Sequence, residues 1–221
     1  MKIMICIPCF GGMIHTETFL SMLQLTMNAD LLKNFNIDEI CIETISNESL
    51  VPRARDSLAS KFLEGSFDKL LFIDADIQFT ITDFVNICFM TSPDDHVVGG
   101  IYRKKTEDLV QYVYQKTKED VANDKIGFNM LLEKSNKDDL EIDVEYVGCG
   151  FMCIDRGVLL KLLNVVNKYG NTYQLFPMMC CDGQLLSEDY AFCELCRNND
   201  IPVKIHSKIF LSHIGKFAFR A

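Results

Sequence analysis

The sequence lacks any long apolar run. No stretch of its 221 residues approaches the roughly 20 consecutive apolar residues that a membrane-spanning helix needs. The apolar run at residues 3–7 is also too short for the core of a secretory signal peptide. The sequence therefore predicts a cytoplasmic protein with no transmembrane segment.

The sequence has fewer basic than acidic residues. The chain carries 22 Lys and Arg against 31 Asp and Glu, a net charge of −9. Nucleic-acid binding depends on Lys and Arg that neutralise phosphate charge, so this composition predicts no nucleic-acid partner. An acidic protein instead provides a favourable field for a bound divalent cation.

The chain also has no Pro- or Gly-rich linker, internal repeat or low-complexity segment. With 48% hydrophobic residues, its length suits a single α/β domain over residues 1–221. Ten cysteines without a secretory signal predict reduced thiols. Two Cys-x-x-Cys pairs, Cys6 with Cys9 and Cys193 with Cys196, could in principle bind zinc, but free buried cysteine is the favoured interpretation.

The apolar pattern alternates between strand and helix, as in a doubly wound sheet. The first helix, capped by Thr16, is expected to turn Phe19, Met22, Leu23 and Met27 inward. In the first half we expect strands at residues 3–7, 38–43, 69–74 and 96–98, and helices at 16–32, from Ser49 through Phe62, and from Thr80 or Thr82 to 90. In the second half we expect strands at 111–114, 144–147, 151–154, 203–206 and 209–211, helices at 155–167 and 187–198, and a polar excursion or mobile loop at 115–140.

The most informative segment is residues 69–76, an apolar run that stops on Asp74 and Asp76. Ligands of open α/β sheets bind outside the carboxyl ends of strands, and residues i and i+2 of an extended segment project to the same side. Two such carboxylates suit Mg²⁺ or Mn²⁺ bridging a diphosphate, which is the chemistry of a nucleotide-sugar site. An isolated Asp-x-Asp more often starts a solvated loop, so the other motifs have to decide.

Two further segments are typical of a phosphate site. Pro8, Phe10 and Gly11 follow the first strand, where backbone passes close to a ligand or needs positive φ. Residues 51–56 start a helix whose N-terminal amides attract anions. Its arginines, Arg53 and Arg55, are about 200° apart around the helix. One is expected to serve the diphosphate or Asp74 and the other to be solvated, and the sequence leaves open which.

The C-terminal third offers acid, base and metal-binding side chains. Glu188 and Asp189 begin a predicted helix, where negative side chains interact favourably with the positive end of the helix dipole. A carboxylate there is also well placed to deprotonate a hydroxyl. His213 ends an alternating strand, and its neutral imidazole suits a divalent transition metal, although a lone histidine is more often structural.

Taken in order, these segments resemble the family-2-like glycosyltransferases of the GT-A fold, including small bacterial, phage and large-DNA-virus members. The resemblance covers nearly the whole chain. It rests on Pro8 with the turn at Gly11-Gly12, and on residues 51–56, 71–76, 148–152, 187–190 and 213–215.

The resemblance implies an α/β GT-A fold: a Rossmann-like central sheet, mixed but mostly parallel, flanked by helices on both faces, with a small additional C-terminal sheet. Residues 1–100 would form the nucleotide-binding half and residues 101–221 the acceptor-binding half. Asp76 and His213 would bind Mn²⁺ or Mg²⁺, and Asp189 would be the acceptor base, with Glu188 as second choice. Donor contacts would come from Pro8, Phe10, Gly11, Arg53, Arg55, Asp56, Asp74, Ala75, Asp76 and Gly150.

The implied activity is inverting, hexosyltransferase-type transfer from a nucleotide sugar, most commonly UDP-linked, in glycan biosynthesis. The acceptor would be a glycan, a lipid or a protein-linked group. Two positions depart from the family pattern, which commonly has Asn at Asp56 and Gly at Ser187. Asp56 adds negative charge near a diphosphate, so its contact would be to the nucleoside or to an arginine.

Two rival functions remain open. A nucleotidyltransferase also uses paired aspartates and a divalent ion. It usually has a longer Gly-rich phosphate loop with a catalytic Lys or Arg near the first strand, and residues 4–16 contain neither Lys nor Arg. A non-catalytic domain that binds a sugar nucleotide is less consistent with the joint presence of Asp74, Asp76, Asp189 and His213.

Overall fold

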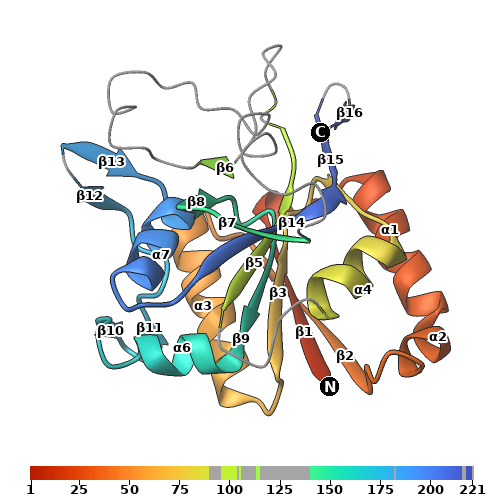
Figure 1. Ribbon diagram of the computed structural model, residues 1–221, viewed down its shortest axis with the longest axis horizontal. Helices are drawn as coiled ribbons and strands as arrows, with labels where there is room; N and C mark the ends of the chain where they lie inside the picture. The colour runs from red at the N-terminus through yellow and green to blue at the C-terminus, as the bar shows by residue number, and fades with distance from the viewer. Residues whose placement is uncertain are drawn as a thin grey trace.

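A seven-stranded sheet forms the centre of the computed structural model, which describes residues 1–89, 96–103, 105, 113–114, 140–181, 183–215 and 218–220 (Figure 1). Its strand order is β2-β1-β3-β9-β5-β14-β7. Strands β9 and β7 run antiparallel to the other five, which are mutually parallel. The strands are β1 (Lys2–Cys9), β2 (Glu39–Ser46), β3 (Lys69–Ile73), β5 (Val97–Ile101), β7 (Glu141–Asp143), β9 (Phe151–Asp155) and β14 (Val203–Phe210).

Helices cover both faces of this sheet (Figure 1). Alternate residues of β1 enter the two hydrophobic cores, because successive side chains of a strand point to opposite faces: Ile3 and Ile5 to one, Met4 and Cys6 to the other. The face with Ile3 is covered by α1 (Thr16–Met27), α2 (Ala29–Lys33) and α4 (Ile81–Phe89). The opposite face is covered by α3 (Val51–Glu64), α6 (Arg156–Leu162) and α7 (Glu188–Arg197). The predicted mixed, mostly parallel α/β fold is confirmed.

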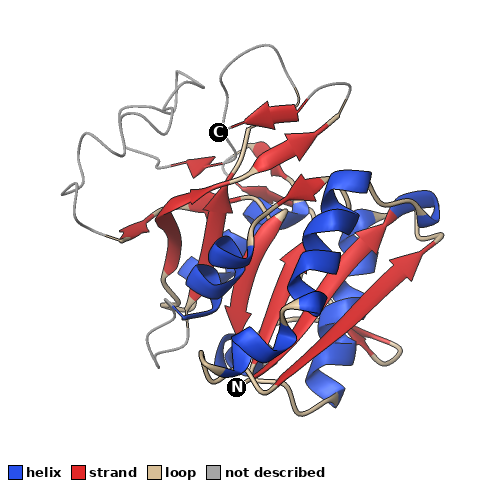
Figure 2. Cartoon of the chain, turned by 90° about the vertical axis from the view of Figure 1, so that its right-hand side faces the viewer, coloured by secondary structure: helices blue, strands red, loops and turns tan. Residues whose placement is uncertain are grey.

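A small three-stranded sheet carries the C-terminal segment back to the end of β3 (Figure 2). Its order is β16 (Ala218–Arg220), β15 (Ser212–Ile214) and β4 (Ile77–Gln78). In the β15–β4 register, His213 pairs with Ile77, and the Ile214 amide donates to the Asp76 carbonyl at 2.7 Å. Residue 213 therefore lies beside the Asp-x-Asp segment.

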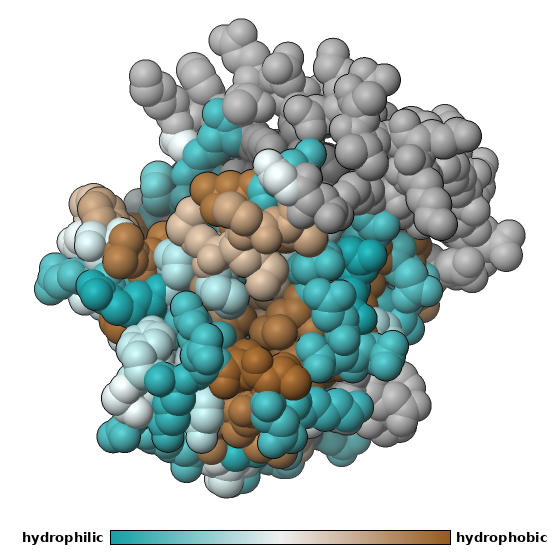
Figure 3. Space-filling model, turned by 90° about the vertical axis from the view of Figure 1, so that its left-hand side faces the viewer, coloured by the Kyte–Doolittle hydropathy of each residue, from teal (hydrophilic) through white to brown (hydrophobic). Residues whose placement is uncertain are grey.

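Short strand pairs complete the described structure. They are β6 (Val113–Tyr114) with β8 (Tyr146–Val147), β10 (Lys168–Tyr169) with β11 (Thr172–Tyr173), and β12 (Met179–Cys181) with β13 (Gln184–Leu186). Figure 3 shows the side of the molecule that carries α6, α7 and the last two hairpins. Apolar patches lie among polar side chains there. Leu160 of α6 and Leu185 of β13 are among the exposed apolar residues of these elements.

The prediction for the first helix was wrong in three respects. The N-cap residue is His15, with no side-chain cap, and Thr16 is already the first helical residue. The helix ends at Met27, and a second helix, α2, begins at Ala29. Of the residues expected to face inward, only Met22 is buried, whereas Phe19 is 52% and Met27 is 76% exposed, and Leu23 is exposed as well. The buried face instead includes Ser21, because its hydroxyl accepts a hydrogen bond from the Phe79 amide at 3.1 Å.

Several predicted boundaries shift in the second half. Of the strand expected at residues 144–147, only β8 at residues 146–147 is present, and a separate strand, β7, precedes it. The helix expected to reach residue 167 ends at Leu162. The strand expected at 111–114 is described only as β6, and the excursion expected at 115–140 lies, apart from Leu140, outside the described residues. The ten cysteines, all within the described residues, form no disulfide bond. None of the helices in the described part of the chain combines the length and the hydropathy of a membrane span.

Candidate active site

A cleft of about 530 Å³ lies where the carboxyl ends of β1, β3 and β5 meet. The N-terminal turns of α3 and α7 close its other side, since Val51 and Arg55 come from α3 and Glu188 and Asp189 from α7. It is lined by Pro8, Phe10, Met13, His15, Val51, Arg55, Asp74, Ala75, Asp76, Tyr102, Cys149, Ser187, Glu188, Asp189 and His213.

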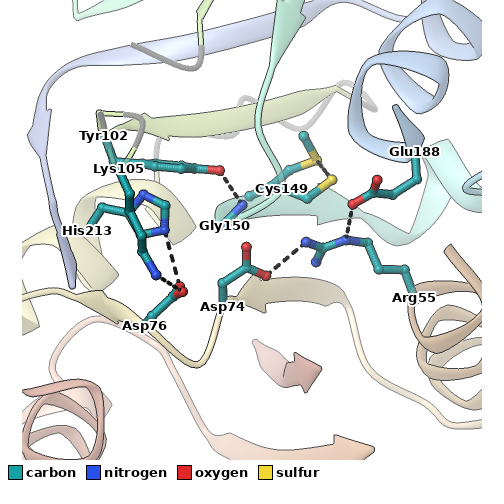
Figure 4. A network of polar contacts seen from close by, with 10 residues as sticks. Arg55, Asp74, Asp76, Tyr102, Lys105, Cys149, Gly150, Glu188 and His213 are labelled. Carbon is teal, nitrogen blue, oxygen red and sulfur yellow. Dashed lines mark hydrogen bonds and ion pairs between the residues drawn. The ribbon is translucent and has the colours of Figure 1, made fainter. Parts of the chain in front are cut away.

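A buried arginine bridges two acids across the floor of the cleft (Figure 4). Arg55 is 3% exposed, and its Nη2 donates to Asp74 Oδ1 at 2.8 Å, while its Nε donates to Glu188 Oε1 at 3.4 Å. Its third nitrogen, Nη1, is buried with no hydrogen-bond partner among the described residues. Burying a guanidinium is tolerable only when it is paired, so Arg55 and its two acids form one electrostatic unit.

Asp76 lies at the other end of the cleft between two nitrogen-bearing side chains (Figure 4). His213 Nε2 is 3.4 Å from Asp76 Oδ1, and Lys105 Nζ contacts Asp76 Oδ2. Burial raises the pKa of Asp76, but His213 and Lys105 outweigh this effect and hold the pKa at about 2. Asp76 is therefore ionised over the whole physiological pH range.

The Asp76–His213 pair fits a divalent cation. His213 Nδ1 lies 2.8 Å from the Arg103 carbonyl oxygen, which can only accept, so Nδ1 carries a proton and Nε2 is the ring nitrogen that faces Asp76. Two ligands that each lie roughly 2.0–2.2 Å from one ion are themselves about 3 Å apart, close to the observed separation. No group of three or more His, Cys, Asp or Glu among the described residues could hold a metal, so this pair would need oxygens from a ligand or solvent.

Asp189 lies in the first turn of α7 and lines the cleft. Its Oδ1 accepts from the Tyr190 amide at 2.9 Å and from the Ser187 hydroxyl. Burial, followed by the negative charge of Glu188, raises the pKa of Asp189 above the usual range. A carboxylate with a raised pKa is a stronger proton acceptor than an exposed aspartate.

Gly150 supports the cleft from behind. Its amide donates to Tyr102 Oη at 2.7 Å, and its carbonyl accepts from the Asp74 amide at 2.9 Å. A Cβ atom at Gly150 would lie 2.6 Å from Tyr102 Oη, so only glycine fits. Gly150 therefore fixes the backbone of Asp74 without lining the cleft itself.

Besides Gly150, three residues predicted to contact the donor lie outside the cleft lining. Arg53 is bound to Glu48 through Nη2 at 2.7 Å, and its side chain is 53% exposed. Asp56 is buried and accepts from the Phe176 amide at 2.7 Å and from Tyr169 Oη at 3.1 Å, so its partners here are a backbone amide and a phenol rather than an arginine. Gly11, with φ +66°, shapes the 3-10 turn η1 (Phe10–Gly12).

The structure thus resolves the choice between the arginines, since Arg55 contacts Asp74 and Arg53 points away. It brings together Arg55, Asp74, Asp76, Glu188, Asp189 and His213, whose individual roles stay predictions. The sequence reasoning missed Lys105, Tyr102 and the Arg103 carbonyl. For Lys105 a signal was present, because Arg103-Lys104-Lys105 is a basic run in an acidic chain.

No protein-family model matches the chain, and no curated protein matches it in sequence. Solved structures do match. The protein A197 from STIV aligns with a TM-score of 0.59 at 20% identity, over 97% of this chain and 86% of that chain.

GalNAc-T7 with UDP, GalNAc and Mn²⁺ aligns with a TM-score of 0.51 at 10% identity, over 93% of this chain and 42% of that chain. A mutant of Drosophila β1,4-galactosyltransferase 7 in complex with manganese, UDP-Gal and xylobiose aligns with a TM-score of 0.49 at 13% identity, over 97% of this chain and 71% of that chain. At these identities the likeness is one of fold, and the chain has the GT-A-type fold.

Proposed function

We propose that the protein is a metal-dependent glycosyltransferase that moves a sugar from a nucleoside-diphosphate sugar, with UDP-sugars favoured, to an acceptor hydroxyl with inversion. The main support for this proposal is that one cleft contains the Asp76–His213 pair, the buried Arg55–Asp74 pair and the Asp189 carboxylate, whose pKa is raised. The shared fold with GalNAc-T7, whose structure holds UDP, GalNAc and Mn²⁺, supports the same class of donor and ion.

The donor side of the reaction belongs to the carboxyl end of β3. Asp76 and His213 would hold Mn²⁺ or Mg²⁺, which supplies positive charge for the leaving diphosphate. Asp74, with both its backbone and its carboxylate fixed by Gly150 and Arg55, orients the donor. Phe10 and Pro8 at the end of β1 line the same part of the cleft and are available to the nucleoside.

The acceptor side belongs to the start of α7. Asp189 takes the proton of the acceptor hydroxyl while that oxygen bonds to the anomeric carbon from the face opposite the diphosphate. The bond between the anomeric carbon and the phosphate oxygen breaks, and its electron pair leaves with the nucleoside diphosphate. A glycan, a lipid or a protein-linked group could supply the hydroxyl.

The test is nucleoside-diphosphate release from a panel of nucleotide sugars in Mn²⁺. The wild-type protein should release the diphosphate slowly without acceptor and should lose activity in excess chelator. Asp76→Asn should abolish turnover, because it removes the negative charge of the metal-binding carboxylate. It should keep the circular dichroism spectrum, because the side-chain volume hardly changes. Asp30→Asn, at an exposed i,i+3 pair on α2, is the matched control and should stay fully active.

Turnover that survives excess chelator would contradict metal dependence. Release of pyrophosphate from a nucleoside triphosphate and a sugar phosphate would indicate a nucleotidyltransferase instead. Tight donor binding without any release would indicate the non-catalytic alternative.

A further inference from the structure

Lys105 supplies a positive charge at the carboxylate that the proposed function assigns to the metal. The two oxygens of Asp76 are divided between partners: Oδ1 faces His213 Nε2 at 3.4 Å, and Oδ2 is contacted by Lys105 Nζ. Figure 4 shows the Lys105 and His213 side chains converging on Asp76 from the same side. An ammonium and a metal ion at this carboxylate would therefore be in direct Coulomb range of each other.

The negative charge of the cleft favours a cation at Asp76. Four carboxylates line it, those of Asp74, Asp76, Glu188 and Asp189. Arg55 is paired with Asp74 and Glu188 but does not contact Asp76. Because Asp76 is only 26% exposed, water alone stabilises its charge poorly, and Lys105 provides the compensating charge.

The backbone that leads to Lys105 is attached to the same site. Tyr102 is buried and accepts from the Gly150 amide, and the Arg103 carbonyl accepts from His213 Nδ1. The Lys105 side chain itself is 33% exposed and has a flexible four-carbon stem. Its ammonium can therefore change partner while its backbone stays in place beside the metal ligand.

We propose that Lys105 is a stand-in cation, which neutralises Asp76 while no metal is bound and moves to the donor diphosphate when a divalent ion takes its place. This inference rests on the proposed function and adds that binding of the metal and binding of the nucleoside diphosphate are coupled. A metal that binds without a nucleotide has to displace the Lys105 ammonium from Asp76, and the two positive charges then repel each other at short range. A metal that binds with a nucleoside diphosphate gives Lys105 a new anionic partner, so each ligand should strengthen binding of the other by the same factor.

The test measures that coupling directly, by calorimetric titration of Mn²⁺ with and without UDP and of UDP with and without Mn²⁺. In the wild-type protein Mn²⁺ should bind more tightly with UDP, by a factor in the typical range of about 5–150. Lys105→Met should raise Mn²⁺ affinity several-fold without UDP, lower UDP affinity in Mn²⁺, and reduce the coupling factor by roughly tenfold.

Three variants make the result specific. Lys105→Arg keeps the charge and should keep most of the coupling, whereas Lys105→Gln should behave like Lys105→Met. Lys204→Met breaks a similar lysine pair, with Glu141 at 2.7 Å outside the cleft, and should leave the coupling unchanged. Thermal melts of each variant establish that it is folded.

Two outcomes would overturn the inference for Lys105. If Lys105→Met weakens Mn²⁺ binding equally with and without UDP, Lys105 only supports the Asp76 carboxylate. If it changes neither affinity, Lys105 has no part in either state. Absence of Mn²⁺ binding by the wild-type protein, with or without UDP, would instead contradict the proposed function on which the inference rests.

Discussion

At the scale of single residues, the cleft gives its carboxylates different protonation behaviour. His213 and Lys105 overcome the effect of burial on Asp76 and hold its pKa at about 2, so Asp76 stays charged. Asp189 is buried beside the negative charge of Glu188, and both effects raise its pKa. Separated pKa values of this kind suit one acid to ligand binding and the other to proton transfer.

Asp189→Asn is expected to lower transfer by roughly 10²- to 10⁴-fold, the usual contribution of a positioned base. Donor and Mn²⁺ affinity should stay near wild type, because the base acts only on the acceptor. Single-turnover kinetics and calorimetry measure the two quantities separately. If the variant keeps full transfer, or loses donor and metal affinity as Asp76→Asn is expected to, the base is not Asp189 and Glu188 becomes the better candidate.

Glu188→Gln should move the acid limb of the pH–rate profile to lower pH. The base must be ionised to accept a proton, so activity falls as pH drops through the raised pKa of Asp189. Burial raises that pKa most and the Glu188 charge adds to it, so removing the charge lowers the pKa. The profile of kcat/KM against pH, taken with saturating Mn²⁺, measures the shift, and an unchanged limb would contradict the coupling of these two acids.

Asp56 is a structural acid whose burial raises its pKa. A carboxyl that is more easily protonated when folded than when unfolded destabilises the folded state at neutral pH, and this effect fades as pH falls through the folded pKa. Asp56→Asn should therefore leave stability equal or higher at pH 7, because the amide oxygen still accepts from Phe176.

Asp56→Ala should instead lose about 1–3 kcal/mol, since it leaves the buried Phe176 amide unpaired. Chemical denaturation at pH 5 and pH 7 checks both variants. A marked loss of stability in Asp56→Asn at pH 7 would show that the negative charge itself is required.

At the scale of elements, α4 shows how one helix begins. Thr80 Oγ1 accepts from the Asp83 amide at 3.1 Å, and Asp83 Oδ2 accepts from the Thr80 amide at 2.8 Å, a reciprocal arrangement that satisfies two backbone donors. Thr80→Ala should cost about 0.5–2 kcal/mol of unfolding free energy. Thr26→Ala, which removes an exposed hydroxyl near the end of α1, is the control and should change stability less in the same denaturation assay.

Element prediction succeeded where a single local pattern decided the outcome. The apolar run of β3 is buried on both faces, and its burial follows directly from its composition. The inward face of α1 could not be predicted from its own pattern, because Ser21 is buried through its hydrogen bond with the Phe79 amide. Phe79 directly follows β4 and lies 58 residues away in the sequence.

At the scale of the whole molecule, the two sequence halves are interleaved in one sheet. β9, from the second half, lies between β3 and β5 of the first, and β14 pairs with β5. Arg156 of α6 donates to the carbonyls of Phe62, Leu63 and Phe67, at and beyond the last turn of α3, the shortest bond being 2.8 Å to Leu63. We therefore expect residues 1–221 to unfold as one domain.

Urea denaturation should give one cooperative transition, with coincident midpoints by far-ultraviolet circular dichroism and tyrosine fluorescence. Arg156→Met should lower that midpoint for both probes, because it removes three charge-assisted hydrogen bonds between the halves. Two separated transitions would indicate independent halves.

The sequence by itself determined the strand-helix alternation, the acidic ends of β3 and α7, and the kinds of side chain available for a metal and a base. These depend on neighbours a few residues apart, where the periods of strand and helix relate sequence to direction. Only the tertiary structure decided which arginine enters the cleft and which cation reaches Asp76. Arg55 meets Glu188 across 133 residues and Lys105 meets Asp76 across 29. Such contacts depend on how helices and loops far apart in the sequence pack around the sheet, which no local pattern encodes.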